Sequence, residues 1–170
     1  KAFSNAKSSG TDGAIDLYAI ELNKLDGTPL QLNELKGKYL LFVNVASRCG
    51  FTGQYKQLER LYQEYGNKLM VIGLPCNQFG AQEPGNAQQI SEFCERNYGV
   101  SFVMTEKIDV KGAKQHRLYQ WLTNKKQNGV KSSSVKWNFQ KYLVSPTGQF
   151  IDFYYSTTSP LSKKITKHLT

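Results

Sequence analysis

The chain has 170 residues, of which 39% are hydrophobic and 12% aromatic. That length builds one hydrophobic core and is too short for two ordinary domains, and no apolar run approaches the roughly 18 residues of a membrane-spanning helix. The formal net charge of +9 favours anionic partners. Because the basic residues are scattered and accompany no nucleic-acid motif, we do not expect nucleic-acid binding. Because the apolar runs are short, we do not expect integral membrane association either.

The first residues differ in composition from the rest. Residues 1–13 are rich in Ser, Asn, Gly and Lys, which predicts a flexible leader ahead of a single domain over residues 14–170. Because the chain begins with Lys1, a removed signal peptide would leave no trace. We expect a cytoplasmic protein, or a periplasmic, secreted or organellar one if such a signal was removed.

Two apolar segments then flank the pair Asp26-Gly27, which is a turn signal. We expect residues 15–22 and 28–32 to form a β-hairpin at one edge of a sheet. Residues 39–47 are apolar nearly throughout, which is typical of a central strand covered on both faces.

A helical period follows over residues 52–65, where leucine and tyrosine side chains recur on one side. Residues 69–75 have the character of a second buried strand, which closes a βαβ unit. Asn86 is a suitable N-cap for a helix over residues 87–97. The apolar face of that helix is formed by Ile90, Phe93 and Cys94.

The second half of the chain continues the alternation of strands and helices. We expect a strand over residues 100–108, a helix over 116–123, a hairpin of residues 141–145 and 149–155, and a last helix over 159–169. This order predicts an α/β fold with a central mixed β-sheet flanked by helices.

Cys49 lies where the predicted central strand ends and the next helix begins. The carboxyl ends of strands are where ligands bind in open α/β sheets. Peroxide reduction needs a thiolate nucleophile, and the amides at a helix N-terminus favour that anion. The alternative role is a small buried hydrophobe, because free cysteine is often buried. A thioredoxin-type oxidoreductase would have Cys-x-x-Cys here, but the fourth position is Thr52, which favours a peroxidatic cysteine.

Three sequence blocks carry a family resemblance. Residues 44–52 read NVASRCGFT, residues 74–85 contain LPCNQFG and QEPG, and residues 136–139 read KWNF. Together they resemble the signature blocks of the glutathione peroxidase family, in its cysteine-type, non-selenium form, and the resemblance extends over about residues 15–169.

The resemblance implies a thioredoxin-like fold and a catalytic tetrad of Cys49, Gln82, Trp137 and Asn138. In that tetrad the two amides and the indole donate hydrogen bonds to the sulfur and orient the peroxide. Other roles stay open: Gln82 as the cap of a turn, Trp137 as a half-buried core aromatic, and Asn138 as a loop residue. A native selenocysteine at position 49 also stays open.

The implied function is a thiol peroxidase that reduces hydrogen peroxide and organic hydroperoxides, lipid hydroperoxides among them, in the response to oxidative stress. Peroxide leaves Cys49 as a sulfenic acid, which a thiol must reduce. Resemblance to the thioredoxin-dependent members assigns the resolving role to Cys94, with core packing as its alternative, whereas Cys76 is expected to be structural. Because a disulfide needs Cα atoms within about 7 Å, we expect the helix that carries Cys94 to unwind locally during turnover.

Glutathione is the alternative reductant to thioredoxin, and a peroxide sensor that passes oxidation to a partner protein is the alternative function. We expect no cofactor, and the cysteines and histidines lack the paired spacing of a zinc site. The chain reads Gln115-His116-Arg117 where the family commonly has His-Pro, and Val103 where Pro is frequent. These departures affect loop shape and reductant docking more than peroxide chemistry. The chain is short where tetrameric members carry an extra loop, so we expect a monomer.

Overall fold

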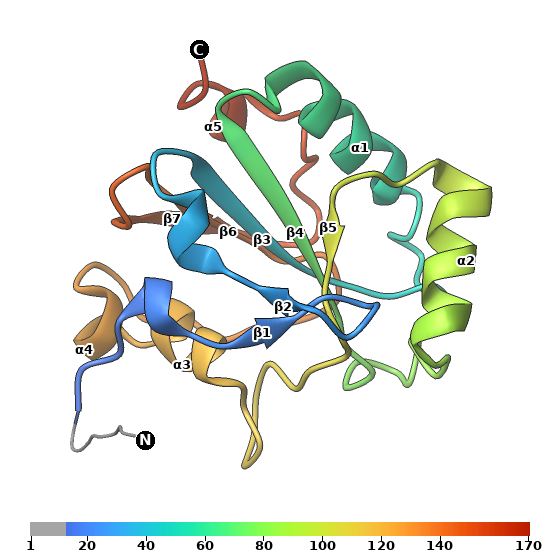
Figure 1. The fold of residues 1–170 in the computed structure, drawn as a ribbon, viewed down its shortest axis with the longest axis horizontal. Helices are drawn as coiled ribbons and strands as arrows, with labels where there is room; N and C mark the ends of the chain where they lie inside the picture. The colour runs from blue at the N-terminus through green and yellow to red at the C-terminus, as the bar shows by residue number, and fades with distance from the viewer. Residues whose placement is uncertain (1–12) are drawn as a thin grey trace.

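The computed structural model describes residues 13–170, and the leader predicted for residues 1–13 lies outside them apart from Gly13. A five-stranded sheet in the order β5-β4-β3-β6-β7 forms the centre (Figure 1). β3, β4 and β5 run parallel, whereas β6 is antiparallel to both β3 and β7, so the predicted mixed sheet is confirmed. The strands are β3 (Tyr39–Val45), β4 (Leu69–Pro75), β5 (Val103–Met104), β6 (Lys141–Val144) and β7 (Phe150–Tyr154).

Helices cover both faces of this sheet and divide the core into two apolar layers (Figure 1). Side chains of β3 alternate between them, so that Leu41 packs with α1 and Phe42 with α3. We call these the α1 layer, which also contains residues of α2 and α5, and the α3 layer, which also contains the N-terminal segment. The helices are α1 (Gln54–Tyr65), α2 (Ala87–Tyr98), α3 (Arg117–Thr123), α4 (Lys125–Asn128) and α5 (Lys163–Thr166).

The predicted βαβ unit is confirmed. β3 and β4 pair along their whole length, from Tyr39 with Leu69 to Val45 with Pro75. The helix between them begins at Gln54 rather than at residue 52, because the chain first makes a tight turn after Cys49.

The predicted cap of α2 is also confirmed. The Asn86 side chain accepts the Gln89 backbone N–H at 2.9 Å, and the Gln89 side chain accepts the Asn86 N–H at 2.9 Å. This capping box starts the helix, which ends at Gly99 in the left-handed conformation.

The N-terminal hairpin is present, but it is shorter than predicted and forms a separate two-stranded sheet of β1 (Leu22–Asn23) and β2 (Pro29–Leu30). The strand predicted over residues 15–22 is wrong, because the Asp16 side chain accepts the Tyr18 N–H at 3.1 Å and starts the 3-10 turn η1 (Leu17–Ala19). A second 3-10 turn, η2 (Leu32–Leu35), follows the hairpin.

Two later predictions are too long. The strand predicted over residues 100–108 is reduced to β5. After it, Thr105 and Ile108 make only single bonds to β4, to Gly73 O and Pro75 O at 2.9 Å, which do not continue the ladder. The other edge of the segment bonds to the N-terminal hairpin, through Leu25 N–H to Met104 O at 3.1 Å. The helix predicted over residues 159–169 is reduced to α5. Serine side chains accept backbone amides ahead of it, including Leu161 N–H on Ser159 Oγ at 3.1 Å, and such bonds compete with helix formation.

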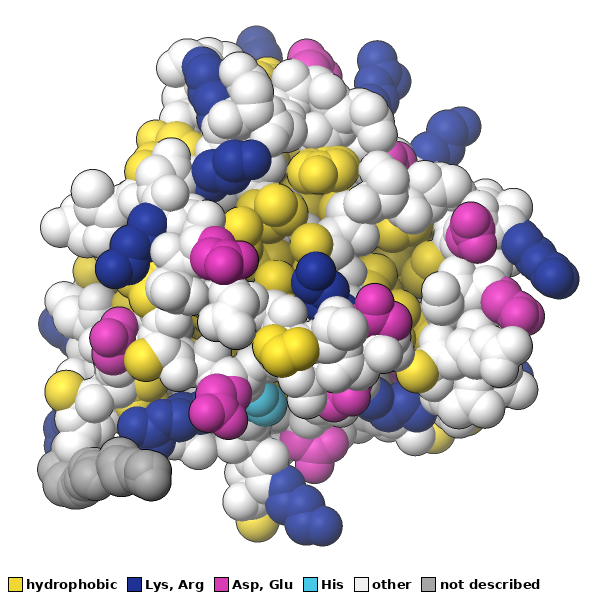
Figure 2. Space-filling view, in the orientation of Figure 1, with side chains coloured by type: hydrophobic (Ala, Val, Ile, Leu, Met, Phe, Trp, Pro, Cys, Tyr) yellow, Lys and Arg dark blue, Asp and Glu magenta, His cyan; other side chains and the backbone are white. Residues whose placement is uncertain are grey.

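The described surface carries charges of both signs. On the face shown in Figure 2, Lys and Arg side chains lie interspersed with Asp and Glu. Within residues 13–170, no helix has the length and apolar character needed to cross a membrane.

Candidate active site

The turn between β3 and α1 is organised by Thr52, which is 6% exposed. Its hydroxyl accepts the Cys49 N–H at 2.8 Å and donates to Ala46 O at 2.9 Å. The Thr52 N–H in turn donates to Cys49 O at 3.0 Å. In the sequence, Thr52 is notable only because it occupies the position of the second cysteine in a Cys-x-x-Cys motif. The structure shows that Thr52 also fixes the conformation of the Cys49 turn.

The Cys49 sulfur is half-buried at the rim of the α1 layer. The Phe51 backbone N–H donates to this sulfur at 3.3 Å. The position therefore combines partial access for a substrate with a backbone donor at the sulfur.

Gln82 is held next to this turn by the backbone. Its carbonyl accepts the N–H of Arg48, the residue before Cys49, at 3.0 Å. Gly80 and Ala81 ahead of it both adopt left-handed conformations, with φ of 68° and 53°, which is uncommon for alanine. A side chain at Gly80 would meet the Gln82 side chain at 3.3 Å, so glycine there leaves room for the amide.

Asn138, which lies 56 positions after Gln82 in the sequence, is fully buried and forms a hydrogen bond with the Gln82 side chain. Its Nδ2 donates to Gln82 Oε1 at 3.0 Å and, more weakly, to Phe79 O at 3.4 Å. The next residue, Phe139, is strained at φ 64°, and its N–H donates to Asn44 O of β3 at 2.6 Å. The sheet thus fixes Asn138 at a defined distance from Gln82.

Trp137 is 36% exposed, which argues against its alternative role as a core aromatic. Its ring packs against Phe79 with centroids 5.7 Å apart. Its carbonyl accepts the Asn44 side-chain N–H at 3.1 Å. The indole is therefore anchored to the sheet yet open to solvent.

The arrangement differs in one respect from the expected tetrad. Within the described chain, none of Gln82, Trp137 and Asn138 donates to Cys49, and Asn138 uses its amide on Gln82. Gln82 Nε2 and Trp137 Nε1 have no partner within residues 13–170, so they are the donors available to a substrate.

The other two cysteines lie in different layers of the core. Cys94 is 2% exposed in the α1 layer, the layer whose rim holds Cys49. Burial, reinforced by the Glu83 carboxylate, raises the pKa of Cys94 to about 11, against a smaller opposing effect of the Tyr55 hydroxyl. Cys76 is fully buried in the α3 layer, and burial raises its pKa as well. The sheet therefore separates Cys76 from Cys49 but not Cys94 from Cys49.

Glu83, next to Gln82, is a buried carboxylic acid with 1% exposure. Its backbone N–H donates to the Asn77 side chain at 2.9 Å. Burial raises the pKa of this carboxyl, and the nearby polar groups of Ser47 oppose the shift. It lines a hollow of about 170 Å³ beside Arg48 and the first turns of α2.

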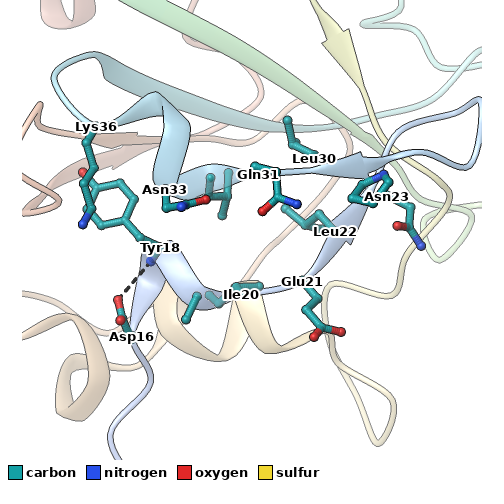
Figure 3. A pocket seen from close by; sticks show the side chains of 13 residues that line it. Asp16, Tyr18, Ile20, Glu21, Leu22, Asn23, Leu30, Gln31, Asn33 and Lys36 are labelled. Carbon is teal, nitrogen blue, oxygen red and sulfur yellow. Dashed lines mark hydrogen bonds between the residues drawn. The ribbon is translucent and has the colours of Figure 1, made fainter.

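A larger groove of the described surface, of about 570 Å³, lies elsewhere. Figure 3 shows its lining on η1, the N-terminal hairpin and η2, with side chains such as Asp16, Glu21 and Lys36. None of the expected site residues lines it. Groove size therefore does not mark the position of the reactive sulfur.

The geometry and the comparisons with known proteins agree. The sequence profile of the family named "Glutathione peroxidase" matches residues 17–123. The chain belongs to the glutathione peroxidase family. It is 46% identical over 146 residues to glutathione peroxidase-like peroxiredoxin 2 of Saccharomyces cerevisiae, covering 85% of this chain and 90% of that protein. It is 43% identical over 150 residues to a hydroperoxy fatty acid reductase of Synechocystis, covering 85% and 89%.

Solved structures extend the likeness to the whole fold. The crystal structure of Trgpx in its apo form shares 37% identity with this glutathione peroxidase family member, with a TM-score of 0.71 over 92% of this chain and 94% of that one. A thioredoxin family protein from Chlorobium tepidum shares 12% identity, with a TM-score of 0.61 over 88% of each chain. The expected thioredoxin-like fold is confirmed.

Proposed function

We propose that this protein is a thiol peroxidase in which Cys49 reduces hydroperoxides and Cys94, together with thioredoxin, restores the Cys49 thiol. The observation that carries the proposal is the half-buried Cys49, whose sulfur accepts a backbone N–H. The turn that holds it is bonded through the Arg48 N–H to the Gln82 carbonyl, and the Gln82 side chain accepts the Asn138 amide. Peroxidase activity is in keeping with the family to which the chain belongs.

In the first step the Cys49 thiolate attacks the outer oxygen of R–O–O–H. A sulfur–oxygen bond forms as the oxygen–oxygen bond breaks, and the inner oxygen takes a proton and leaves as an alcohol, or as water when R is hydrogen. Cys49 becomes a sulfenic acid. We assign Gln82 Nε2 and Trp137 Nε1 as donors to the charge on sulfur and on the leaving oxygen, and Asn138 as the residue that orients Gln82.

In the second step the Cys94 sulfur attacks the Cys49 sulfenic acid. A disulfide forms, and the hydroxyl leaves as water after taking the proton released by Cys94. Cys94 is buried on the inner face of α2, so that helix must open first. Only Ile90 and Cys94 are buried among its 12 residues, which makes α2 suited to local unfolding. Thioredoxin then reduces the disulfide.

The proposal is tested by following NADPH consumption with one hydroperoxide and two reducing systems, thioredoxin with its reductase and glutathione with its reductase. We expect faster turnover with thioredoxin. Cys49→Ser should abolish turnover in both systems, and Cys94→Ser should abolish only the thioredoxin-linked reaction. Cys76→Ala is the matched control, because its sulfur lies in the other layer, and it should keep wild-type turnover.

Each failure has a separate meaning. Peroxide reduction that survives Cys49→Ser overturns the whole proposal. Normal thioredoxin-linked turnover in Cys94→Ser overturns the resolving role alone, and faster turnover with glutathione overturns the choice of reductant. Slow turnover with rapid mixed-disulfide formation to one partner protein would instead favour a peroxide sensor.

Organic and lipid hydroperoxides are proposed as substrates beside hydrogen peroxide. The exposed Trp137 edge and the hollow beside Arg48, which is lined in part by Pro84, Ile90 and Phe93, leave apolar surface near Cys49. The Synechocystis relative is named as a hydroperoxy fatty acid reductase. Rates of Cys49 oxidation by hydrogen peroxide, cumene hydroperoxide and a fatty acid hydroperoxide would rank the three, and a rate for hydrogen peroxide far above both others would contradict this choice.

A further inference from the structure

Lys141, the first residue of β6, is a buried amine without a carboxylate partner. Its side chain is fully buried, and within residues 13–170 it takes part in no ion pair. It faces the α1 layer, as do Leu143 two residues on and Val43 across the strand pair. Burial lowers the pKa of Lys141 to about 7. An apolar side chain would pack at this position without the cost of burying an amine. The amine therefore has a role other than packing.

The Lys141 amine is bound by the loop that follows β7. Its Nζ donates to Ser156 O at 3.2 Å and to Thr158 O at 2.5 Å. Gln54, the first residue of α1, donates through Nε2 to the same Ser156 O at 2.7 Å. Ser156 is thus held jointly by β6 and by the helix that begins just after Cys49.

Ser156 passes this restraint to the expected active site. Its hydroxyl donates to Asn138 O at 2.5 Å, and Ser156 is only 7% exposed. Asn138 is therefore held at both ends, by Ser156 at its carbonyl and by Gln82 at its side chain. The chain of contacts runs from Lys141 through Ser156 and Asn138 to Gln82.

We propose that Lys141 is a positioning residue of the peroxide site, which holds Ser156 so that Ser156 fixes the Trp137-Asn138 segment against Gln82. The proposal rests on the roles assigned above to Gln82, Trp137 and Asn138. Donors accelerate a reaction when they are held in place before charge develops. Without Lys141, the Ser156 carbonyl keeps only Gln54. The segment that carries the Trp137 donor, and the Asn138 amide that orients Gln82, then loses one of its restraints.

The test measures single-turnover oxidation of Cys49 by hydrogen peroxide in a stopped-flow instrument. The chain has two tryptophans, so a Trp121→Phe background makes Trp137 the only tryptophan, and excitation at the red edge of the tryptophan band reports on it selectively. We expect Lys141→Met, which keeps the length of the side chain but has no donor, to slow the oxidation about tenfold or more. Ser156→Ala should slow it to a similar extent, and the double variant should be no slower than the slower single variant, because both act on one path.

Lys131→Met is the matched control. Lys131 is exposed and pairs with Asp152 of β7 at 3.0 Å, outside the path to Asn138, so its oxidation rate should stay within about twofold of wild type. Acrylamide quenching of Trp137 should increase in Lys141→Met and Ser156→Ala but not in Lys131→Met. Urea titration is used to show that each variant is folded under the assay conditions. In a folded variant, a loss of global stability alone would not change the acrylamide quenching of Trp137.

An unchanged oxidation rate in Ser156→Ala or in Lys141→Met overturns the proposal. A rate reduction in the double variant equal to the product of the two single reductions also overturns it. Should Lys141→Met not fold, the rate and quenching of Ser156→Ala decide alone. Asn138→Ala separates this inference from the proposed function. A normal rate in Asn138→Ala overturns this inference and the role assigned to Asn138, but not peroxide reduction by Cys49. A slow Asn138→Ala with a normal Lys141→Met overturns only the role of Lys141.

Discussion

Replacing Thr52 by valine removes one hydroxyl and leaves the shape of the side chain nearly unchanged. That hydroxyl is the acceptor for Cys49 N–H at 2.8 Å and the donor to Ala46 O at 2.9 Å. Ala46 is fully buried, so its carbonyl would stay unpaired, at a cost of about 1–3 kcal/mol. The Cys49 N–H lies nearer to solvent and adds about 1 kcal/mol. We therefore expect Thr52→Val to lower the free energy of unfolding by about 2–4 kcal/mol.

The same substitution should slow peroxide reduction. The Thr52 hydroxyl sets the turn that brings the Phe51 N–H to the Cys49 sulfur, so its loss displaces both the donor and the sulfur from their positions in the turn. We expect the rate of Cys49 oxidation to fall about tenfold to a hundredfold, which corresponds to about 1.4–2.8 kcal/mol. Urea denaturation measures the first effect and stopped-flow oxidation of the reduced protein measures the second.

Thr52→Ser is the matched control, because it keeps both hydrogen bonds and loses only a methyl group, at a cost of about 1 kcal/mol. It should oxidise within about threefold of the wild-type rate. Equal oxidation rates in Thr52→Val and Thr52→Ser, measured where both are folded, would refute the reasoning.

Three further predictions concern Lys141, the cap of α2 and the Cys94 thiol. Burial lowers the pKa of Lys141 from 10.5 to about 7, so the folded state binds fewer protons than the unfolded state between these values. Wild-type stability should therefore rise relative to Lys141→Met as the pH increases from 7 to 10.5, by up to about 5 kcal/mol, as urea titrations at both pH values would show. Asn86→Ala removes the cap of α2, worth about 1 kcal/mol, and should speed formation of the Cys49–Cys94 disulfide about fivefold if opening of α2 limits that step. Burial raises the pKa of Cys94 to about 11, so iodoacetamide at pH 7.5 should alkylate Cys49 well before Cys94, as peptide mass spectrometry would reveal.

Each of these predictions can fail in a defined way. A stability difference between wild type and Lys141→Met that stays constant with pH would show that the amine keeps its ordinary pKa. Slower disulfide formation in Asn86→Ala would mean that an intact α2 is needed for the reaction. Equal labelling of Cys49 and Cys94 would mean that α2 is already open in the reduced protein.

The longest elements were predicted well because their signals are local. β4 has the predicted bounds, and α2 begins after its predicted cap at Asn86. The short elements were predicted less well. The segment over residues 100–108 looks like a strand, but its pairing depends on the N-terminal hairpin, which lies about 80 residues away in sequence and bonds to it through Lys24 and Leu25.

The candidate site divides in the same way. Cys49 was found from its place between a buried strand and a helix, whereas Gln82, Trp137 and Asn138 were named through the family resemblance. One sequence signal for the buried amine was overlooked: Lys141 shares its side of β6 with Leu143, and a lysine on the buried side of a strand indicates a specific partner.

The sequence by itself predicted Cys49 as the candidate nucleophile, and it determined the family and the alternation of buried strands and amphipathic helices. Periodicity and motifs suffice for these because they are properties of neighbouring residues. Only the tertiary structure decided that Asn138 binds Gln82 across 56 positions of sequence, that Cys76 lies on the opposite side of the sheet from Cys94, and that Lys141 binds the loop at Ser156. These depend on which side chains the packed layers bring within hydrogen-bonding distance, and that distance is set by the whole fold.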